Sequence, residues 1–148
     1  MGNKTPITIE ATVKAPLKTV WKCWSDPQHI KGWAFASDDW EAPYAENDLR
    51  TGGKFMTRMQ AKGTTDEFDF NGVYTKVEKH KVIEYDMEKA LNEEKSRHVK
   101  AIFEETPDGV RIIQTFDPET ENPVEMQREG WQAILNNFKK YTEKNNND

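Results

Sequence analysis

The order of apolar and polar residues predicts β-structure over most of the chain. In Ile7–Val13 the two kinds of side chain alternate strictly, as they do in a strand with one buried face. The same period of two returns in later segments that are separated by turn residues, and Gly72 is expected to mark a bend in one of them. We predict strands over Ile7–Val13, Ala42–Leu49, Lys54–Gln60, Glu67–Val77, Lys81–Met87, Lys95–Glu105 and Val110–Phe116.

A helical period replaces the alternation near the C-terminus. We predict a long helix from Pro123 to Lys144, with Asn122 as its N-cap and Pro123 at the first helical position. One face is a broad apolar stripe of Val124, Gln127, Trp131, Ile134, Leu135, Phe138 and Tyr141. The other side of the helix is expected to carry Glu125, Glu129, Gln132, Asn136, Lys139, Lys140 and Glu143.

Two short helices are predicted between the first and second strands. Pro16 opens the first, which runs to about Ser25, and Pro27 opens the second, which Gly32 ends. The segment from Trp33 to Trp40 is interpreted as a loop or as the entry to a strand.

The resulting order is strand, two helices, six strands and a long helix, which places the chain in the α+β class. We predict an antiparallel meander with the first strand added at an edge, curved around the C-terminal helix as a helix-grip fold. A single domain, residues 1–148, is expected, with its core over about residues 7–142. Because the two layers of such a fold need not meet everywhere, a cavity between sheet and helix is expected.

Composition narrows the classes of function. Only 35% of the 148 residues are hydrophobic but 11% are aromatic, so a few rings must supply much of the buried surface. The net charge is −5 with acids and bases interleaved, which argues against binding to nucleic acid or to an anionic membrane. There is no apolar run of spanning length and no signal peptide, and the single cysteine, Cys23, is interpreted as a buried thiol. These features favour a cytoplasmic protein.

Motifs for catalysis or metal binding are not evident. His29, His80 and His98 fall on different predicted elements without ligand spacing, so we predict no metal site and no cofactor. No nucleophile elbow, phosphate-binding loop or dinucleotide fingerprint is present. Two carboxylate clusters are interpreted as solvated faces: Asp38, Asp39 and Glu41, and Asp66, Glu67 and Asp69.

Three amides occupy positions that the periodicity assigns to the interior, namely Asn47, Gln114 and Gln127. A buried amide without partners costs about 1–3 kcal/mol. The amides either face a wet or ligand-filled cavity, or bond to nearby backbone or follow a shifted register. The inward aromatic rings have a similar pair of interpretations, as closed core or as cavity lining. The predicted ligand-binding set is Trp33, Phe35, Asn47, Phe55, Met59, Phe68, Phe70, Tyr74, Tyr85, Phe103, Gln114, Gln127 and Trp131.

Several short motifs occur in a recognisable order. They are Val20-Trp21 with Trp24, Asp26-Pro27, Trp33, Asp48-Leu49-Arg50-Thr51-Gly52-Gly53-Lys54-Phe55, Gly72-Val73-Tyr74, and Gly130-Trp131 with Leu135. Together they resemble the SRPBCC superfamily (Bet v 1-like, START-like), in the branch related to the C-terminal domain of the activator of Hsp90 ATPase. The resemblance covers about Ile7 to Thr142. It implies a β-α-α-β6-α helix-grip fold with a cavity that relatives use for lipids, polyketides, plant hormones and other apolar molecules.

Three functions follow as hypotheses. The first is binding of a small, mostly apolar molecule, lipid-like, polyketide or aromatic, with an amide or a tyrosine hydroxyl orienting it. The second is a cyclase or hydratase that uses the same cavity; the predicted interior offers amides and phenols but no clear His, Asp or Glu, which favours binding. The third is a protein-interaction module like the Hsp90 co-chaperone. A monomer or a homodimer would serve any of the three.

Overall fold

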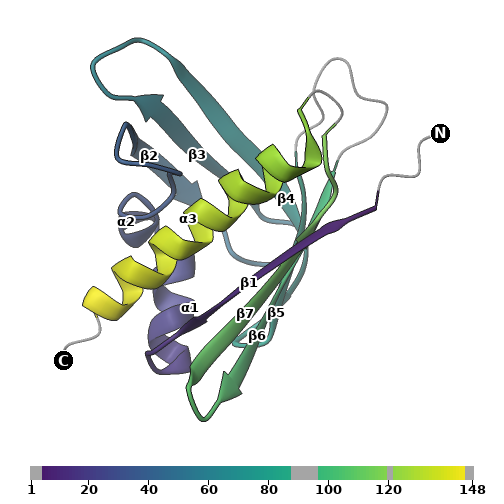
Figure 1. The fold of residues 1–148 in the computed structure, drawn as a ribbon. Helices are drawn as coiled ribbons and strands as arrows, with labels where there is room; N and C mark the ends of the chain where they lie inside the picture. The colour runs from purple at the N-terminus through teal and green to yellow at the C-terminus, as the bar shows by residue number, and fades with distance from the viewer. Residues whose placement is uncertain (1–4, 88–96, 120–121, 146–148) are drawn as a thin grey trace.

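The computed structural model describes residues 5–87, 97–119 and 122–145. The elements follow the predicted order and confirm the α+β class (Figure 1). They are β1 (Ile7–Val13), α1 (Leu17–Ser25), α2 (Pro27–Ile30), β2 (Trp40–Asn47), β3 (Lys54–Ala61), β4 (Glu67–Glu78), β5 (Val82–Met87), β6 (His98–Thr106), β7 (Gly109–Phe116) and α3 (Val124–Lys144). None of these helices is long and apolar enough to cross a membrane. The predicted loop Glu88–Glu94 and the predicted strand start at Lys95 lie outside the described residues.

The strands form one antiparallel sheet in the order β1-β7-β6-β5-β4-β3-β2. β2 to β7 make the predicted meander, and β1 joins at the edge beside β7, where Ile7 pairs with Phe116 and Val13 with Val110. The sheet curls around α3, which crosses its concave side, as expected for a helix-grip fold (Figure 1).

The second strand ends earlier than predicted, at Asn47 instead of Leu49. A tight turn takes over at Asp48, whose carbonyl oxygen would lie 2.0 Å from a β-carbon placed on Gly53. Gly52 in the same turn has φ of +88°, which glycine adopts without steric cost. The turn therefore needs both glycines and includes residues that the alternation had assigned to a strand.

The beginning of α3 differs from the prediction. Pro123 is the N-cap and makes no side-chain capping hydrogen bond, so the predicted cap by Asn122 is wrong. The Asn122 side chain instead donates to the Glu119 carboxylate at 2.8 Å. Val124 is 46% exposed, so its assignment to the buried stripe is also wrong. Thr142, which was not predicted, is fully buried at the other end of the helix.

Gln127 ties the chain that precedes α3 to the helix. Its side-chain oxygen accepts from the Glu119 N–H at 2.8 Å, and its Nε2 donates to the carbonyls of Asn122, at 2.8 Å, and Glu119, at 3.2 Å. Gln127 is only 7% exposed. One buried side chain of the helix therefore satisfies three backbone groups of the segment that precedes α3.

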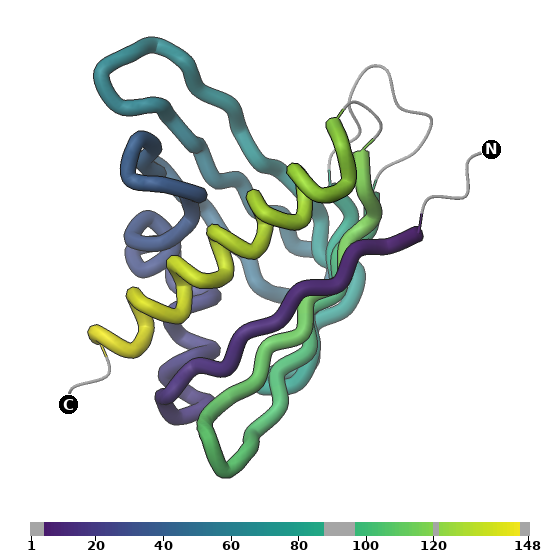
Figure 2. The backbone as a smooth tube through the Cα atoms, in the orientation of Figure 1, coloured from purple at the N-terminus to yellow at the C-terminus, as the bar shows by residue number. Residues whose placement is uncertain are grey.

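Polar side chains of α3 attach the helix to the free edge of β1. Arg128 Nη1 donates to the Thr8 carbonyl at 3.1 Å, Gln132 Nε2 to the Glu10 carbonyl at 3.1 Å, and Lys139 Nζ to the Thr12 carbonyl at 2.7 Å. These carbonyls alternate along the edge that β7 leaves unpaired, and edge groups of this kind need partners. Two residues of the predicted polar side of the helix, Gln132 and Lys139, thus also attach it to β1. Figure 2 shows β1 running alongside α3.

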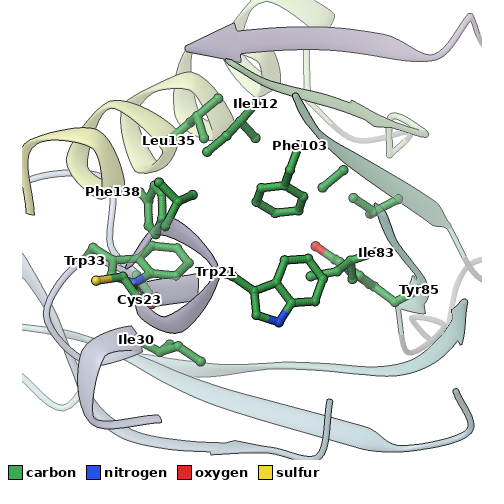
Figure 3. Close-up of a cluster of buried hydrophobic side chains, with 14 of the residues drawn as sticks. Trp21, Cys23, Ile30, Trp33, Ile83, Tyr85, Phe103, Ile112, Leu135 and Phe138 are labelled. Atoms are coloured by element: carbon green, nitrogen blue, oxygen red, sulfur yellow. Dashed lines mark hydrogen bonds between the residues drawn. The ribbon is translucent and has the colours of Figure 1, made fainter. Parts of the chain in front are cut away.

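One end of the space between the layers is filled by aromatic rings. Phe138 of α3 packs edge-on against Trp24 and Trp33, with ring centroids 5.0 and 4.9 Å apart, and Trp24 meets Phe103 at 5.3 Å. Trp33 donates its Nε1 hydrogen to the Cys23 carbonyl at 2.9 Å. Figure 3 shows three of these rings, Trp33, Phe103 and Phe138, between α1, α3 and the sheet. Cys23 is 2% exposed, as predicted.

On the opposite, convex face of the sheet, His98 lies between two carboxylates. Its Nδ1 is 2.7 Å from Asp86 Oδ1 and its Nε2 is 2.8 Å from Glu84 Oε1. Both ring nitrogens can donate only in the imidazolium form. Burial disfavours that charge, but the hydrogen bonds to Asp86 and Glu84 outweigh it and raise the pKa of His98 above its ordinary value.

The raised pKa predicts a pH-dependent contribution to stability. The contribution of His98 is complete below its pKa in the unfolded protein, about 6.5, and is lost as pH rises through its higher pKa in the folded protein. The substitution His98→Gln should therefore reduce the free energy of unfolding more in mild acid than in mild base, with a difference of roughly 0.5 kcal/mol for this solvent-screened group. Urea denaturation in mild acid and in mild base measures this difference. An equal loss at both would show that His98 is not held as a cation.

A second substitution tests the anchor at the start of α3. Gln127→Leu removes partners from Glu119 and Asn122 and should lower the free energy of unfolding by about 1–2 kcal/mol. Glu129→Gln, on the exposed face of the same helix, is the control and should change it little. Equal urea midpoints for the two variants would contradict the assigned role.

Candidate ligand-binding cavity

A cavity of about 350 Å³ separates the first half of α3 from the concave face of the sheet. Its floor comes mainly from β3, β4 and β5, its roof from α3, and one wall from α1 and α2. The lining residues are Trp24, Ile30, Trp33, Ala34, Glu46, Asn47, Phe55, Thr57, Met59, Phe68, Phe70, Tyr74, Tyr85, Met87, Arg97, Gln114, Glu119, Gln127, Trp131, Ile134 and Leu135.

The structure brings most of the predicted ligand-binding residues to this one space. Trp33, Asn47, Phe55, Met59, Phe68, Phe70, Tyr74, Tyr85, Gln114, Gln127 and Trp131 all line it. Phe103 does not, because it packs on Trp21 and Trp24 in the closed core, with ring centroids 5.2 and 5.3 Å away. Phe35 is half-buried against the core and is also outside the lining. That the lining residues hold a ligand stays a prediction.

Some lining residues were missed although the sequence carried a signal. Thr57 lies between Phe55 and Met59, and Met87 follows Tyr85, so strand alternation places both on the inner face. Arg97 has the same parity as the buried Val99, but a charged residue at a strand end is not normally read as inward. Whether Trp24, Ile30 and Ala34 reach the cavity depends on how the short helices pack against the sheet, which sequence periodicity does not predict.

Aromatic rings make up most of the floor. Phe55 lies at its centre, with ring centroids 4.8 Å from Tyr85, 5.2 Å from Tyr74 and 5.4 Å from Phe70. A β-carbon on Gly72 would come within 2.5 Å of the Phe55 ring, so glycine is required for this ring to lie across β4. The register of β4 shifts between Tyr74 and Lys76, close to the predicted bend but not at Gly72 itself.

Both ends of the Asn47 amide are bonded within the protein. The Tyr74 hydroxyl donates to Asn47 Oδ1, and Asn47 Nδ2 donates to the Ser25 carbonyl at 2.7 Å. Burial raises the pKa of Tyr74, which keeps the hydroxyl protonated as a donor. Asn47 therefore links β2, β4 and the end of α1, and the alternative that it bonds to backbone is confirmed. Gln127, bonded to the backbone before α3, behaves in the same way.

Gln114 differs from the other two amides. It is 6% exposed and lines the cavity, and its amide makes no hydrogen bond to any residue that the structure describes. Tyr85 is likewise 6% exposed, and within the described residues its hydroxyl has no hydrogen-bond partner. Burial raises the pKa of Tyr85, so this hydroxyl too remains a donor. Both groups keep hydrogen-bonding capacity inside the cavity.

Charged groups are few at the cavity. The Glu119 carboxylate accepts from the Asn122 backbone and side chain, both at 2.8 Å, and Glu46 accepts from the Tyr44 hydroxyl. Arg97 contributes positive charge. Within the described ranges, no group of three or more His, Cys, Asp or Glu side chains could hold a metal ion. The predicted solvated carboxylates, such as Asp38 and Asp66, are exposed.

Comparisons with known proteins agree with this architecture. The family model described as "Activator of Hsp90 ATPase homolog 1-like protein" matches residues 14–143. The solution structure of an AHSA1-like protein from Aeromonas hydrophila is similar, with 37% identity, a TM-score of 0.86, and coverage of 95% of this chain and 94% of that one. A search of curated proteins gives no match.

Two further solved structures are similar. A protein from Cytophaga hutchinsonii shares 48% identity with a TM-score of 0.77, over 97% of this chain and 94% of that one. A protein from Chromobacterium violaceum, 19% identical, shares the fold with a TM-score of 0.81, over 93% of this chain and 97% of that one. The family match over most of the sequence and the helix-grip fold lead to one conclusion: this chain belongs to the Activator of Hsp90 ATPase homolog 1-like family, a branch of the SRPBCC superfamily.

Proposed function

We propose that this protein binds one small, mostly apolar molecule in the cavity beneath α3. The observation that carries the proposal is the cavity itself, about 350 Å³ in volume and floored by aromatic rings. Pockets that bind small molecules start at roughly 300 Å³ and are mainly apolar with a few placed polar groups. The cavity fits that description at its lower end, so the ligand is small.

Apolar burial would supply the affinity. Each Å² of apolar surface removed from water contributes about 25 cal/mol. The rings of Phe55, Phe70 and Tyr85 meet at steep angles, so the floor presents both faces and edges. Aromatic and conjugated ligands pack well against such surfaces.

Phe68 marks the entrance. It lines the cavity but is 52% exposed, and its ring meets Trp40 at 5.8 Å. A large apolar side chain in this position forms a rim between the interior and solvent. A ligand would enter past Phe68, between the β3–β4 hairpin and α3.

The alternatives have less support. An enzyme of the cyclase or hydratase type would use a titratable group in the cavity. Tyr74 and Tyr85 have raised pKa values and serve as donors instead of bases. The cavity also contains two carboxylates that were not predicted from the sequence, but Glu46 accepts from Tyr44 and Glu119 from Asn122. A co-chaperone would need an exposed apolar surface. Phe68, among the few large exposed apolar side chains of the described residues, already belongs to the cavity rim.

Filling the cavity should weaken binding. Thr57→Phe adds a ring to the cavity floor, whereas Val73→Phe adds the same ring on the outer face of β4, where Val73 is 40% exposed. We expect the wild type to bind the neutral dye N-phenylnaphthylamine at one saturable site, seen as increased fluorescence. Thr57→Phe should weaken binding by about tenfold or more, which is about 1.4 kcal/mol, and Val73→Phe should not.

Circular dichroism shows whether both variants are folded. Equal dye affinity in a folded Thr57→Phe protein and in the wild type would rule out the cavity as the binding site.

A further inference from the structure

Two long polar side chains in the cavity make no hydrogen bond to any residue that the structure describes. They are Tyr85 of β5 and Gln114 of β7, each 6% exposed, and both line the cavity. In the same lining, by contrast, Asn47 bonds to Tyr74 and Ser25. A buried polar group that lacks a partner is costly, so the Tyr85 hydroxyl and the Gln114 amide mark places where a bound molecule could supply the missing hydrogen bonds.

The register of the sheet keeps these two groups apart. Tyr85 pairs with Val99 of β6, and Val99 pairs with Phe116 of β7. Gln114 stands two residues before Phe116 and pairs with Ala101. Gln114 is thus two strands and one two-residue step away from Tyr85, which places their Cα atoms roughly 12 Å apart at the usual spacings of a sheet. A ligand that meets both side chains most simply carries two polar groups of its own.

The stretch between the two groups is apolar. β6 crosses it, and the inward side chains of this strand, Val99 and Ala101, are fully buried. Trp131 and Leu135 of α3 line the cavity from the side of the helix. A ligand that reaches from Tyr85 to Gln114 would therefore have an apolar middle.

The charges of the lining favour a ligand without charge. The lining contains two carboxylates, Glu46 and Glu119, and one guanidinium, Arg97. The carboxylates accept hydrogen bonds from Tyr44 and Asn122, and Arg97 also interacts within the protein. None of the three is an open counter-ion, and taking a charged group out of water without a counter-ion is strongly unfavourable.

The two side chains differ in the hydrogen bonds that they can make. Burial raises the pKa of Tyr85, so its hydroxyl stays protonated and can donate. The Gln114 amide offers both donor hydrogens and an acceptor oxygen. A carbonyl or hydroxyl oxygen of a ligand therefore suits Tyr85, and a hydroxyl or amide group suits Gln114.

We propose that the ligand is an uncharged molecule with two polar ends, one accepting from Tyr85 and the other bonded to Gln114, joined by an apolar core. This inference rests on the proposed function and narrows the ligand class. Aromatic diols and hydroxy-ketones have this chemistry, and the volume of about 350 Å³ suits a core of two fused rings.

Three naphthalene probes separate the effects of the two ends and of charge. Naphthalene-2,6-diol carries a hydroxyl at each end, 2-naphthol carries one, and 6-hydroxy-2-naphthoate has a carboxylate in place of the second hydroxyl. In isothermal titration calorimetry of the full chain at neutral pH, we expect the diol to bind about fivefold more tightly than 2-naphthol, through the additional hydrogen bond. It should bind at least about tenfold more tightly than the naphthoate, whose charge would be buried without a partner.

Substitutions then assign the two ends. Tyr85→Phe and Gln114→Leu should each weaken binding of the diol about fivefold, and at most one of them should weaken binding of 2-naphthol by that factor, because 2-naphthol has a single hydroxyl. Gln28→Leu, at an exposed position of α2 outside the lining, is the matched control and should affect neither probe. Neither cavity substitution removes a hydrogen bond to a described residue, so both variants should unfold at a urea midpoint no lower than that of the wild type.

The outcomes are distinct. Equal affinity of the wild type for the diol and 2-naphthol, tighter binding of the naphthoate than of the diol, or diol binding that both cavity substitutions leave intact would each overturn this inference and leave the proposed apolar binding standing. Failure of the wild type to bind any of the three probes up to their limits of solubility would overturn the proposed function and this inference with it.

Discussion

The attachment of α3 to the free edge of β1 decides the shape of this molecule. Donors on one side of the helix, at Arg128, Gln132 and Lys139, meet the carbonyls that an edge strand would otherwise leave open. The contacts extend over most of the helix, so its axis follows β1 and not the middle of the sheet. They also cover an edge that could pair with another chain, which removes one route to a dimer through strand addition.

A helix fixed at one edge cannot fill a strongly curled sheet, and the aromatic residues divide accordingly. Near α1, Phe138 and Trp24 close the space with edge-on ring contacts. Toward β3, β4 and β5, the cavity lies between the layers and Phe55 and Tyr85 form its floor, although Trp131 of α3 still meets Phe70 of β4 with ring centroids 6.1 Å apart. The cavity is thus a consequence of where the helix is anchored. The polar side chains that line it are of two kinds. Asn47 and Gln127 bond to other parts of the protein, whereas Tyr85 and Gln114 make no hydrogen bond to a residue that the structure describes.

Much of the fold could be predicted because it rests on local periodicity. Alternation placed Gln114 inward between Ile112 and Phe116, and the structure confirms that position. The partners of each side chain could not be predicted in this way. Asn47 bonds to a carbonyl 22 residues away, and Lys139 to one 127 residues away, so only the assembled fold shows that both are structural. For the same reason, the sequence could not separate Phe103 in the core from Phe55 at the cavity, since both occupy inward strand positions.

The central claim is that the folded protein holds a small molecule in the space under α3. Native mass spectrometry of protein purified without added ligand tests it most directly, by comparing the wild type with the cavity-filled Thr57→Phe variant. The account predicts a wild-type mass above that of the polypeptide by one small molecule, which leaves on unfolding, and a Thr57→Phe protein without it. The same mass increment in both proteins, or none in either, would contradict the account.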